Sequence, residues 1–335
     1  MKKKVTVLVI CATVFALVTA CSGAGGGDVG IAIGPSASAT QAVTKVILDA
    51  YGIEEGSYRE FQEGFGDAMD GVKDGNIDIS FGVLGLPAAS ITDLQASTGD
   101  VKLLSLSDEA IQYVEEKSGY LRYTIPADSY DFLEEDVETV TAYAVLVANT
   151  NTVDDELAYE LAKVMIEHAD ENTHAQAEQM TLENALNGLE GLPIHPGAKR
   201  YYEEQGLTVE AEEAQISADA ANRKSELVLG TGSQGGTYYP LGGEIANIWN
   251  NYIDGVNVTN TETGASVENL VSIRDGTMDL GMTVHVPARE ALEGTGEFDG
   301  SPVENFAFIG HIYPEVVQIV TREATGINSL DELAN

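Results

Sequence analysis

The sequence predicts an α/β fold built from two similar lobes. Short apolar strand-like segments alternate with amphipathic helical segments along most of the chain, which favours α/β architecture. The length of 335 residues, with 44% hydrophobic and 21% charged residues, predicts a globular chain of two domains. Two segments also resemble each other: residues 72–79 read VKDGNIDI and residues 273–280 read IRDGTMDL. Each Asp-Gly pair is typical of a helix end, and we favour a repeated unit over a chance similarity of two turns.

The N-terminus predicts export and lipid anchoring. Residues 1–4 are basic and residues 5–20 are apolar, a stretch shorter than the roughly 20 residues that a membrane-spanning helix needs, so residues 1–20 are a signal peptide. The signal ends in LVTAC, which resembles the lipobox of bacterial lipoproteins and predicts lipidation at Cys21. An ordinary secretory peptide with a chance cysteine is the alternative. Cys11 and Cys21 are the two cysteines, so the mature chain would have no internal disulfide.

The first part of the mature chain begins with a short tether, residues 21–27. A lobe is expected over residues 28–138, with a strand at 29–33, a turn at 34–40, helices at 41–50 and 67–73, and a strand at 77–83. Residues 139–210 are expected to add a long strand at 140–148, a helix at 154–168 and a helix at 198–204, all belonging to the other lobe. His195-Pro196-Gly197 is expected to lead into the last of these helices.

The second part repeats the pattern. Residues 211–225 lose apolar periodicity and are expected to be a linker. A second lobe is expected over residues 226–335 and is expected to end at the crossover between the lobes. It has a strand at 226–229, a turn at 230–236, a helix carrying Leu241 and Trp249, a helix at 267–274 and a strand at 278–283.

The charge balance excludes some partners. Asp and Glu number 54 against 17 Lys and Arg, which gives a net charge of −37, or −40 without the three lysines of the signal. A nucleic acid partner that needs a basic surface is therefore not expected, nor is binding to anionic lipid by charge. The acidic surface suits a solvated, extracytoplasmic setting.

Each lobe has a small polar turn between a strand and a helix, where open α/β sheets bind ligands. Free backbone N–H groups and the helix dipole at such a turn attract anions. Hydroxyl groups can add hydrogen bonds, from Ser36, Ser38 and Thr40 in one lobe and from Thr231, Ser233 and Thr237 in the other. The structural alternative is that these residues only cap helices and form tight turns.

Catalytic interpretations are weaker. The segment 230–235 reads GTGSQG and satisfies the dinucleotide-binding pattern. The helix after it, however, is expected to begin only at residues 238–240, and no convincing ribose-binding acid ends the next strand, where Glu262 is the nearest candidate. A nucleophile elbow requires a glycine two residues before the serine, and Thr231 occupies that position before Ser233. The five histidines show no metal spacing, and solvated or helix-capping roles are expected for them. We therefore expect no enzyme activity, no cofactor and no metal.

The sequence resembles the solute receptors of TRAP transporters, in the TAXI family. The resemblance is carried by GTGSQGGTYYPLGG at 230–243, ETGASVENL at 262–270 and HIYPEVVQ at 311–318, and by DGNID at 74–78, GLP at 85–87 and HPGA at 195–198. It covers nearly all of the mature chain.

The order of these segments differs from that of the family, in which the GTGS segment opens the mature protein and the HPGA segment closes it. Joining residue 335 to residue 27 or 28 would restore the family order. We therefore interpret the chain as a circular permutant in which residues 211–225 join the old ends; a rearranged gene with two partial copies is the alternative.

The resemblance implies a type II periplasmic-binding-protein-like fold, with two lobes joined by a β-strand hinge near residues 140–148 and 316–321. It implies a monomeric, lipid-anchored extracytoplasmic receptor that closes on a small organic anion, either a glutamate-like amino acid or a dicarboxylate, and delivers it to a TRAP permease. An exported α/β enzyme or dinucleotide-binding protein remains the alternative. Arg289 is weighed as a charge partner for the ligand against a solvated helix residue. The expected ligand contacts are Thr231, Gly232, Ser233, Thr237, Tyr238, Ala265, Ser266, Ser36, Ser38, Thr40, Gly85 and Pro87.

Overall fold

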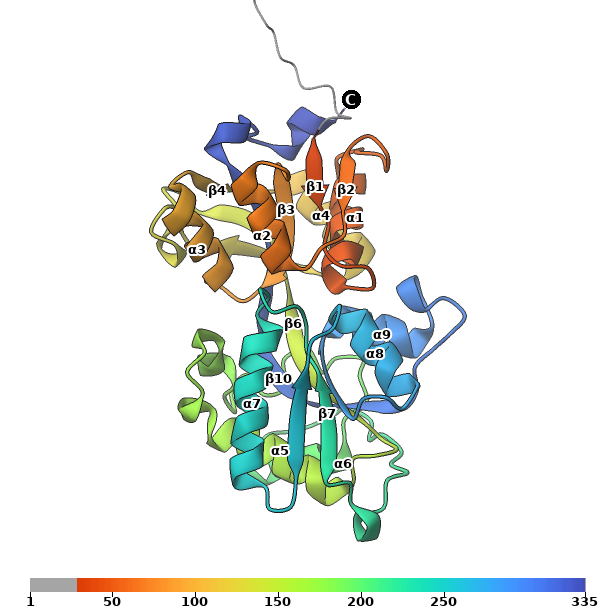
Figure 1. The fold of residues 1–335 in the computed structure, drawn as a ribbon. Coiled ribbons are helices and arrows are strands. Elements are labelled where there is room, and N and C mark those ends of the chain that lie inside the picture. The colour runs from red at the N-terminus through yellow and green to blue at the C-terminus, as the bar shows by residue number, and fades with distance from the viewer. Residues whose placement is uncertain (1–28, 335) are drawn as a thin grey trace, which may run out of the picture.

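The computed structural model of the protein describes residues 29–334, which form two α/β lobes stacked end to end (Figure 1). The predicted signal, the tether and the lipidation site Cys21 lie outside the described residues. Lobe I contains strands β1–β5 and helices α1–α4, and lobe II contains helices α5–α9 and strands β7–β9. Strands β6 and β10 belong to both.

Lobe I is built around short parallel strands with helices against them. Strand β2 is the edge strand, β1 lies between β2 and β3, and β3 is buried at every position. The elements are β1 (Gly30–Ala32), α1 (Ala39–Ala50), β2 (Arg59–Phe61), α2 (Phe65–Asp74), β3 (Ile79–Leu84), α3 (Ala89–Thr98), β4 (Val101–Leu103), α4 (Asp108–Ser118) and β5 (Leu121–Ile125).

Lobe II repeats this arrangement around β7, with two helices contributed by the preceding segment of the chain. Trp249 is fully buried in its core and donates its ring N–H to the carbonyl of Leu161, 3.1 Å away. The elements are α5 (Asp155–Glu167), α6 (Pro196–Glu204), β7 (Glu226–Gly230), α7 (Tyr238–Tyr252), β8 (Asn257–Thr261), α8 (Ser266–Arg274), β9 (Leu280–Val284) and α9 (His285–Glu293). Short 3₁₀ turns occur at Ala127–Ser129, Ala169–Glu171, Ala175–Gln179, Ala220–Asn222, Gly296–Phe298, Glu323–Thr325 and Leu330–Leu333.

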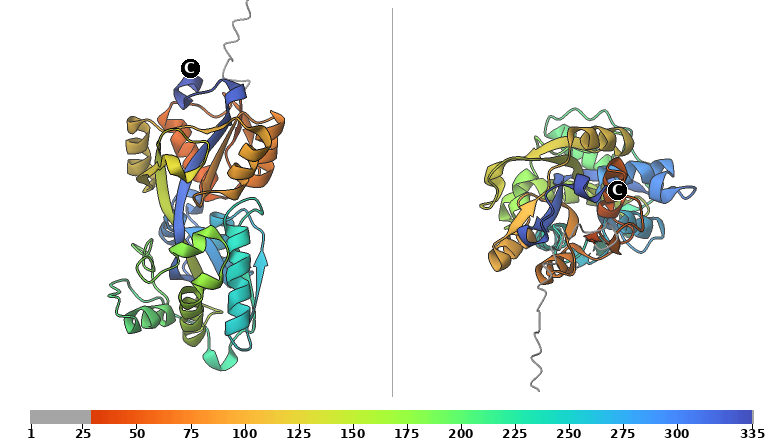
Figure 2. Two further views of the ribbon diagram at one scale, coloured as in Figure 1. Left: turned by 90° about the vertical axis from the view of Figure 1, so that its left-hand side faces the viewer. Right: turned by 90° about the horizontal axis from the view of Figure 1, so that it is seen from above.

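Two long strands, β6 (Val137–Asn149) and β10 (Phe306–Arg322), run antiparallel through the junction of the lobes (Figure 2). The strand order is β2-β1-β3-β10-β6-β9-β7-β8, so each lobe places its first strand between its second and third and then adds the crossing pair. This topology is a type II periplasmic-binding-protein-like fold, which confirms the predicted fold class. The two predicted hinge runs lie within the crossing strands.

The two similar sequence segments occupy equivalent places. In lobe I, Gly30 donates its N–H to the carboxylate of Asp78 at 2.6 Å, and in lobe II, Val228 donates to Asp279 at 2.9 Å. Each acid thus ties the entrance of the third strand to the first strand. Gly75 and Gly276 both have a φ of +73°, the left-handed conformation that ends a helix without steric cost.

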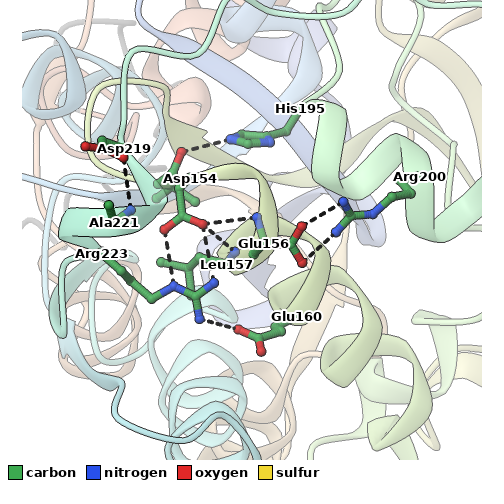
Figure 3. Close-up of polar contacts among 10 residues, drawn as sticks. Asp154, Glu156, Leu157, Glu160, His195, Arg200, Asp219, Ala221 and Arg223 are labelled. Atoms are coloured by element: carbon green, nitrogen blue, oxygen red, sulfur yellow. Dashed lines mark hydrogen bonds and ion pairs between the residues drawn. The ribbon is translucent and has the colours of Figure 1, made fainter.

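The segment predicted as a linker, residues 211–225, is fixed to lobe II. Arg223 forms ion pairs with Asp154 at 3.2 Å and with Glu160 at 2.7 Å (Figure 3). Asp154 also caps α5 by accepting hydrogen bonds from the N–H groups of Glu156 and Leu157. Lys224 adds an ion pair to the buried Asp279 at 2.8 Å. Ion pairs and backbone hydrogen bonds, such as that from Ser217 N–H to the Thr150 carbonyl at 2.9 Å, hold this segment although it has no periodic apolar face.

Most predicted elements occur with boundaries shifted by a few residues. Helix α1 begins two residues earlier than expected, because Ser38 caps it by accepting a hydrogen bond from Gln41 N–H. His195 caps α6 in the same way, as expected, through Gly197 N–H. Strand β9 begins two residues later than expected, since Met278 still belongs to the turn after α8.

Candidate ligand-binding cavity

The candidate site is a cavity between the lobes, at the carboxyl ends of their parallel strands. Its volume is about 60 Å³. The turns after the first and second strands of each lobe face it, together with the end of β3 and one residue of β10. The lining residues are Gly34, Pro35, Ser38, Ala39, Thr40, Glu63, Phe65, Phe81, Gly82, Val83, Leu84, Gly232, Ser233, Gly236, Thr237, Tyr238, Gly264, Ala265, Ser266 and Glu315.

Four helices begin at this cavity. Helices α1, α2, α7 and α8 each contribute at least one lining residue from the N-cap or the first turn. The positive ends of these helix dipoles and the N–H groups of their first turns therefore point toward a common space. This arrangement favours a negatively charged group on the ligand.

Glu315 on β10 lies at the junction between the lobes and is only 3% exposed. Tyr313 donates its hydroxyl to one carboxylate oxygen at 2.7 Å, and Tyr238 donates to the other at 3.1 Å. Burial raises the pKa of Glu315 to about 8, although both hydroxyl groups oppose this shift. Sequence reasoning missed this residue. The available signal was a single acid within a long apolar β-type run.

Side-chain cations are absent from the described residues that line the cavity. The lining includes two acids, Glu63 at the exposed rim and Glu315 inside, but none of its residues is lysine, arginine or histidine. Attraction for an anion would therefore come from helix termini and hydroxyl groups.

Eight of the twelve predicted contacts line the cavity, and four lie elsewhere. The eight are Ser38, Thr40, Gly232, Ser233, Thr237, Tyr238, Ala265 and Ser266. Two of their hydroxyl groups already serve the fold: Ser38 caps α1, and Ser266 accepts a hydrogen bond from Val284 N–H at 3.0 Å. Both residues therefore line the cavity and also hold the local fold in place.

The other four predicted contacts have different surroundings. Thr231 is fully buried and donates its hydroxyl to Asn260 and to the Thr261 carbonyl, which holds β7 and β8 together. Ser36 and Pro87 are exposed outside the cavity. Gly85 donates its N–H to the Thr237 hydroxyl at 3.0 Å and thereby links the lobes.

The lobes are in contact around the cavity. Ser90 of lobe I donates its hydroxyl to the Gly235 carbonyl at 3.1 Å, and Glu268 of lobe II donates its N–H to the Ala37 carbonyl at 3.3 Å. A Cβ added to Gly235 would lie 2.3 Å from Gly66 Cα, so the two backbones meet closely enough to require glycine. The structure is therefore a closed arrangement of the lobes.

Two alanines at this contact have unusual backbone conformations. Ala37 and Ala265 have φ values of +59° and +71°, and they are the described non-glycine residues with positive φ. Such conformations cost about 1–3 kcal/mol each and persist where surrounding contacts impose them. Both flank the turns that face the cavity.

Other sequence candidates lie away from the cavity or act within the fold. Arg289 lies on α9 beside Gly119 and Gly191 and does not line the cavity. Glu262 accepts hydrogen bonds from the backbone and side chain of Gln234, at 3.2 and 2.9 Å, and so fastens the GTGSQG turn itself.

The expectation of solvated or capping histidines is wrong for two of the five. His285 and His311 are buried on either side of Tyr143, with ring centroids 5.5 Å from it in each case. Burial lowers the pKa of each to about 4. His311 lies in β10 and His285 begins α9, and both are neutral side chains packed in the interior. Their polarity did not indicate in the sequence that they would be buried.

The sequence matches the profile of the NMT1-like family over residues 18–206 and 229–335. The protein belongs to the NMT1-like family. The intervening residues 207–228, which include the whole predicted linker 211–225, lie outside the matched ranges.

Solved structures similar to this NMT1-like protein have low sequence identity to it. A phosphate-binding protein of a phosphate ABC transporter from Streptococcus pneumoniae is 13% identical, with 91% of this chain and 94% of that chain covered and a TM-score of 0.39. A binding protein component of an ABC phosphonate transporter from Pseudomonas aeruginosa is 12% identical, with 88% and 68% covered and a TM-score of 0.41. The substrate binding protein of an amino acid ABC transporter is 8% identical, with 92% and 90% covered and a TM-score of 0.40.

Residues 29–334 lack two kinds of feature. No helix in this part of the NMT1-like protein is long and apolar enough to cross a membrane. Within the same residues, no group of three or more histidine, cysteine, aspartate or glutamate side chains is arranged to hold a metal ion.

Proposed function

We propose that this NMT1-like protein is an extracytoplasmic receptor that captures a small organic anion between its lobes and delivers it to a TRAP-type permease. The observation that carries the proposal is the cavity between the lobes at which four helices, two from each lobe, begin. Two crossing strands provide a hinge about which such lobes open and close. The motifs shared with TAXI receptors support the TRAP assignment.

The anchoring and partners follow from the same proposal. The mature protein would be a monomer held at the outer face of the membrane by lipid on Cys21, with the permease subunits and a small carboxylate as partners. The proposed receptor has no nucleic acid partner and uses no cofactor. A receptor is favoured over an exported enzyme or a dinucleotide-binding protein, because Glu262 is engaged by the turn that would need to receive a dinucleotide.

Ligand-dependent stability tests this proposal. A ligand that binds only the folded protein stabilises it by about 2.7 kcal/mol at 100 times its Kd. Thermal unfolding of the mature chain, measured with amino acids, monocarboxylates and dicarboxylates, should show a concentration-dependent rise in Tm for one of these classes. NAD and ATP serve as controls for the dinucleotide alternative. A folded sample whose Tm responds to none of the carboxylates would overturn the receptor proposal.

We also propose that the chain is a circular permutant of the TAXI order. The ends of the described chain support this, since Val29 and Leu330 belong to the same hydrophobic cluster of lobe I and Leu333 packs against it. A gene encoding residues 211–335 followed directly by residues 28–210 tests the proposal, because it changes the order and keeps the ion pairs of Arg223 and Lys224. The reordered protein should fold with the same circular dichroism spectrum and the same ligand response; failure to fold, when the present order does fold, would contradict it.

A further inference from the structure

The cavity has two ends of opposite electrostatic character. The helix termini and turn N–H groups favour an anion, whereas Glu315 presents a carboxyl group from the crossing strand. A ligand with one negative group would use only the first end. A ligand with a negative and a positive group would use both.

Glu315 has hydrogen bonds but no ion pair among the contacts of the described residues. Its two hydrogen bonds come from neutral tyrosine hydroxyls, and Tyr238 and Tyr313 are themselves buried. A buried carboxylate is costly unless a cation accompanies it, so an isolated Glu315 favours its neutral form. The raised pKa agrees with this physical picture. Beside a cation, the carboxyl group of Glu315 would ionise, and its remaining lone pairs would accept hydrogen bonds from that cation.

We propose that Glu315 binds the ammonium group of a zwitterionic ligand, so that the solute is an α-amino acid rather than a dicarboxylate. This inference rests on the proposed receptor function. The ligand carboxylate would lie at the helix termini, and its ammonium group would complete the hydrogen bonding of Glu315. A second ligand carboxylate at Glu315 would meet either a like charge or, at best, a neutral acid.

Proton release distinguishes these two cases. At pH 7 the free protein holds a proton on Glu315, and an incoming ammonium group would displace it to solvent while keeping its own protons. Amino acid binding should therefore release up to one proton per ligand, whereas a dicarboxylate that accepts a hydrogen bond from neutral Glu315 would release none. Tyr120, Tyr238 and Tyr313 surround the carboxyl group, and burial together with its charge raises their pKa values well above their usual range, so they would not supply the proton.

The experiment is calorimetric titration of the mature protein with matched ligand pairs. L-alanine is compared with propionate and L-glutamate with glutarate, because each pair differs only by the ammonium group. Titrations at pH 7 in two buffers of different ionisation enthalpy give the number of protons released. We expect at least one amino acid to bind about 100-fold more tightly than its partner, with proton release, because only the amino acid can form a charge-assisted hydrogen bond to Glu315.

Variants assign the preference to Glu315. Glu315→Gln should reduce the preference for the amino acid to below about 10-fold and abolish proton release, while Glu315→Asp should keep both in part. Proton release by the wild type gives an answer even if a variant fails to fold. Tighter binding of glutarate or propionate, or amino acid binding that releases no proton and is unchanged in Glu315→Gln, would overturn the inference and leave the receptor function standing. Binding of neither class would overturn the receptor function itself.

Discussion

At the scale of single residues, Glu315 makes folding stability depend on pH in a defined direction. Its pKa is raised to about 8 in the folded protein, above that of an exposed glutamate. Between about pH 4.5 and 8 the folded state therefore holds a proton that the unfolded state has lost. The contribution of Glu315 to stability therefore falls as pH rises through this window and is constant above it.

The variant Glu315→Gln should remove this dependence. Its free energy of unfolding should approach that of the wild type at pH 4.5 and exceed it increasingly up to pH 8.5, by at most about 1.4 kcal/mol per pH unit. Urea unfolding of both proteins without ligand at three pH values measures the difference. His285 and His311, with pKa values lowered to about 4, titrate in the opposite sense in both proteins and cancel. A constant difference across the range would show that Glu315 titrates normally.

A second prediction concerns the paired acids Asp279 and Asp78. Asp279→Ala would leave the Val228 N–H and the Lys224 ammonium without their carboxylate, at a cost of about 2–3 kcal/mol. Asp78→Ala is the matched control, because the Asp78 side chain is 29% exposed against 2% for Asp279 and water can replace it. We expect it to cost about 1 kcal/mol. Equal losses in chemical denaturation would contradict this explanation.

Residue type alone did not determine which predicted contacts lie at the cavity. Ser36 and Ser38 stand in one small turn, yet only Ser38 lies at the cavity, because the turn exposes its neighbour. Thr231 likewise gives its hydroxyl to β8. Glu315 was missed since its partner Tyr238 is 77 residues away, and only the folded chain brings them together.

At the scale of elements, the lobes meet where the glycine-containing turn before α7 approaches the first turn of helix α2. Gly235→Ala would place a Cβ 2.3 Å from the backbone of Gly66, so the lobes could not close to the same extent. Affinity for the ligand should fall about 10-fold or more, because the binding-competent closed fraction falls.

The control for this variant is Gly66→Ala, whose added Cβ would lie 3.1 Å from Gly235 Cα and should have a smaller effect. Calorimetry gives the affinities, and small-angle scattering with ligand gives the radius of gyration, which should be larger for Gly235→Ala. Unchanged affinity and radius would show that this contact does not limit closure.

Periodicity predicted most elements because each helix buries one face and the crossing strands bury both. The runs at 140–148 and 316–321 were therefore recognised as β structure, although β10 begins ten residues earlier, at Phe306. The anchoring of residues 211–225 was not predicted. It depends on ion pairs of Arg223 and Lys224 with distant acids, for which local sequence has no period.

At the scale of the whole molecule, the net charge of −37 opposes the approach of an anion. The lining of the cavity offers no cationic side chain to offset it, and exposed Glu63 adds a negative charge at the rim. Binding would depend on short-range donors, whereas the approach is governed by the long-range field. Salt screens this field over about 8 Å at physiological ionic strength.

Raising the salt concentration from about 0.02 to 0.3 M should therefore increase the association rate of an anionic ligand, by a factor of about 2–5. L-glutamate, with a net charge of −1, should show the increase, and L-alanine, with no net charge, should not. Stopped-flow measurement of intrinsic fluorescence, with Trp249 in lobe II as one reporter, gives both rates. The comparison separates screening of the field from any effect of salt on lobe closure, which would act on both ligands alike. A glutamate rate that falls steeply with salt would mean that a local positive potential guides the ligand in spite of the total charge.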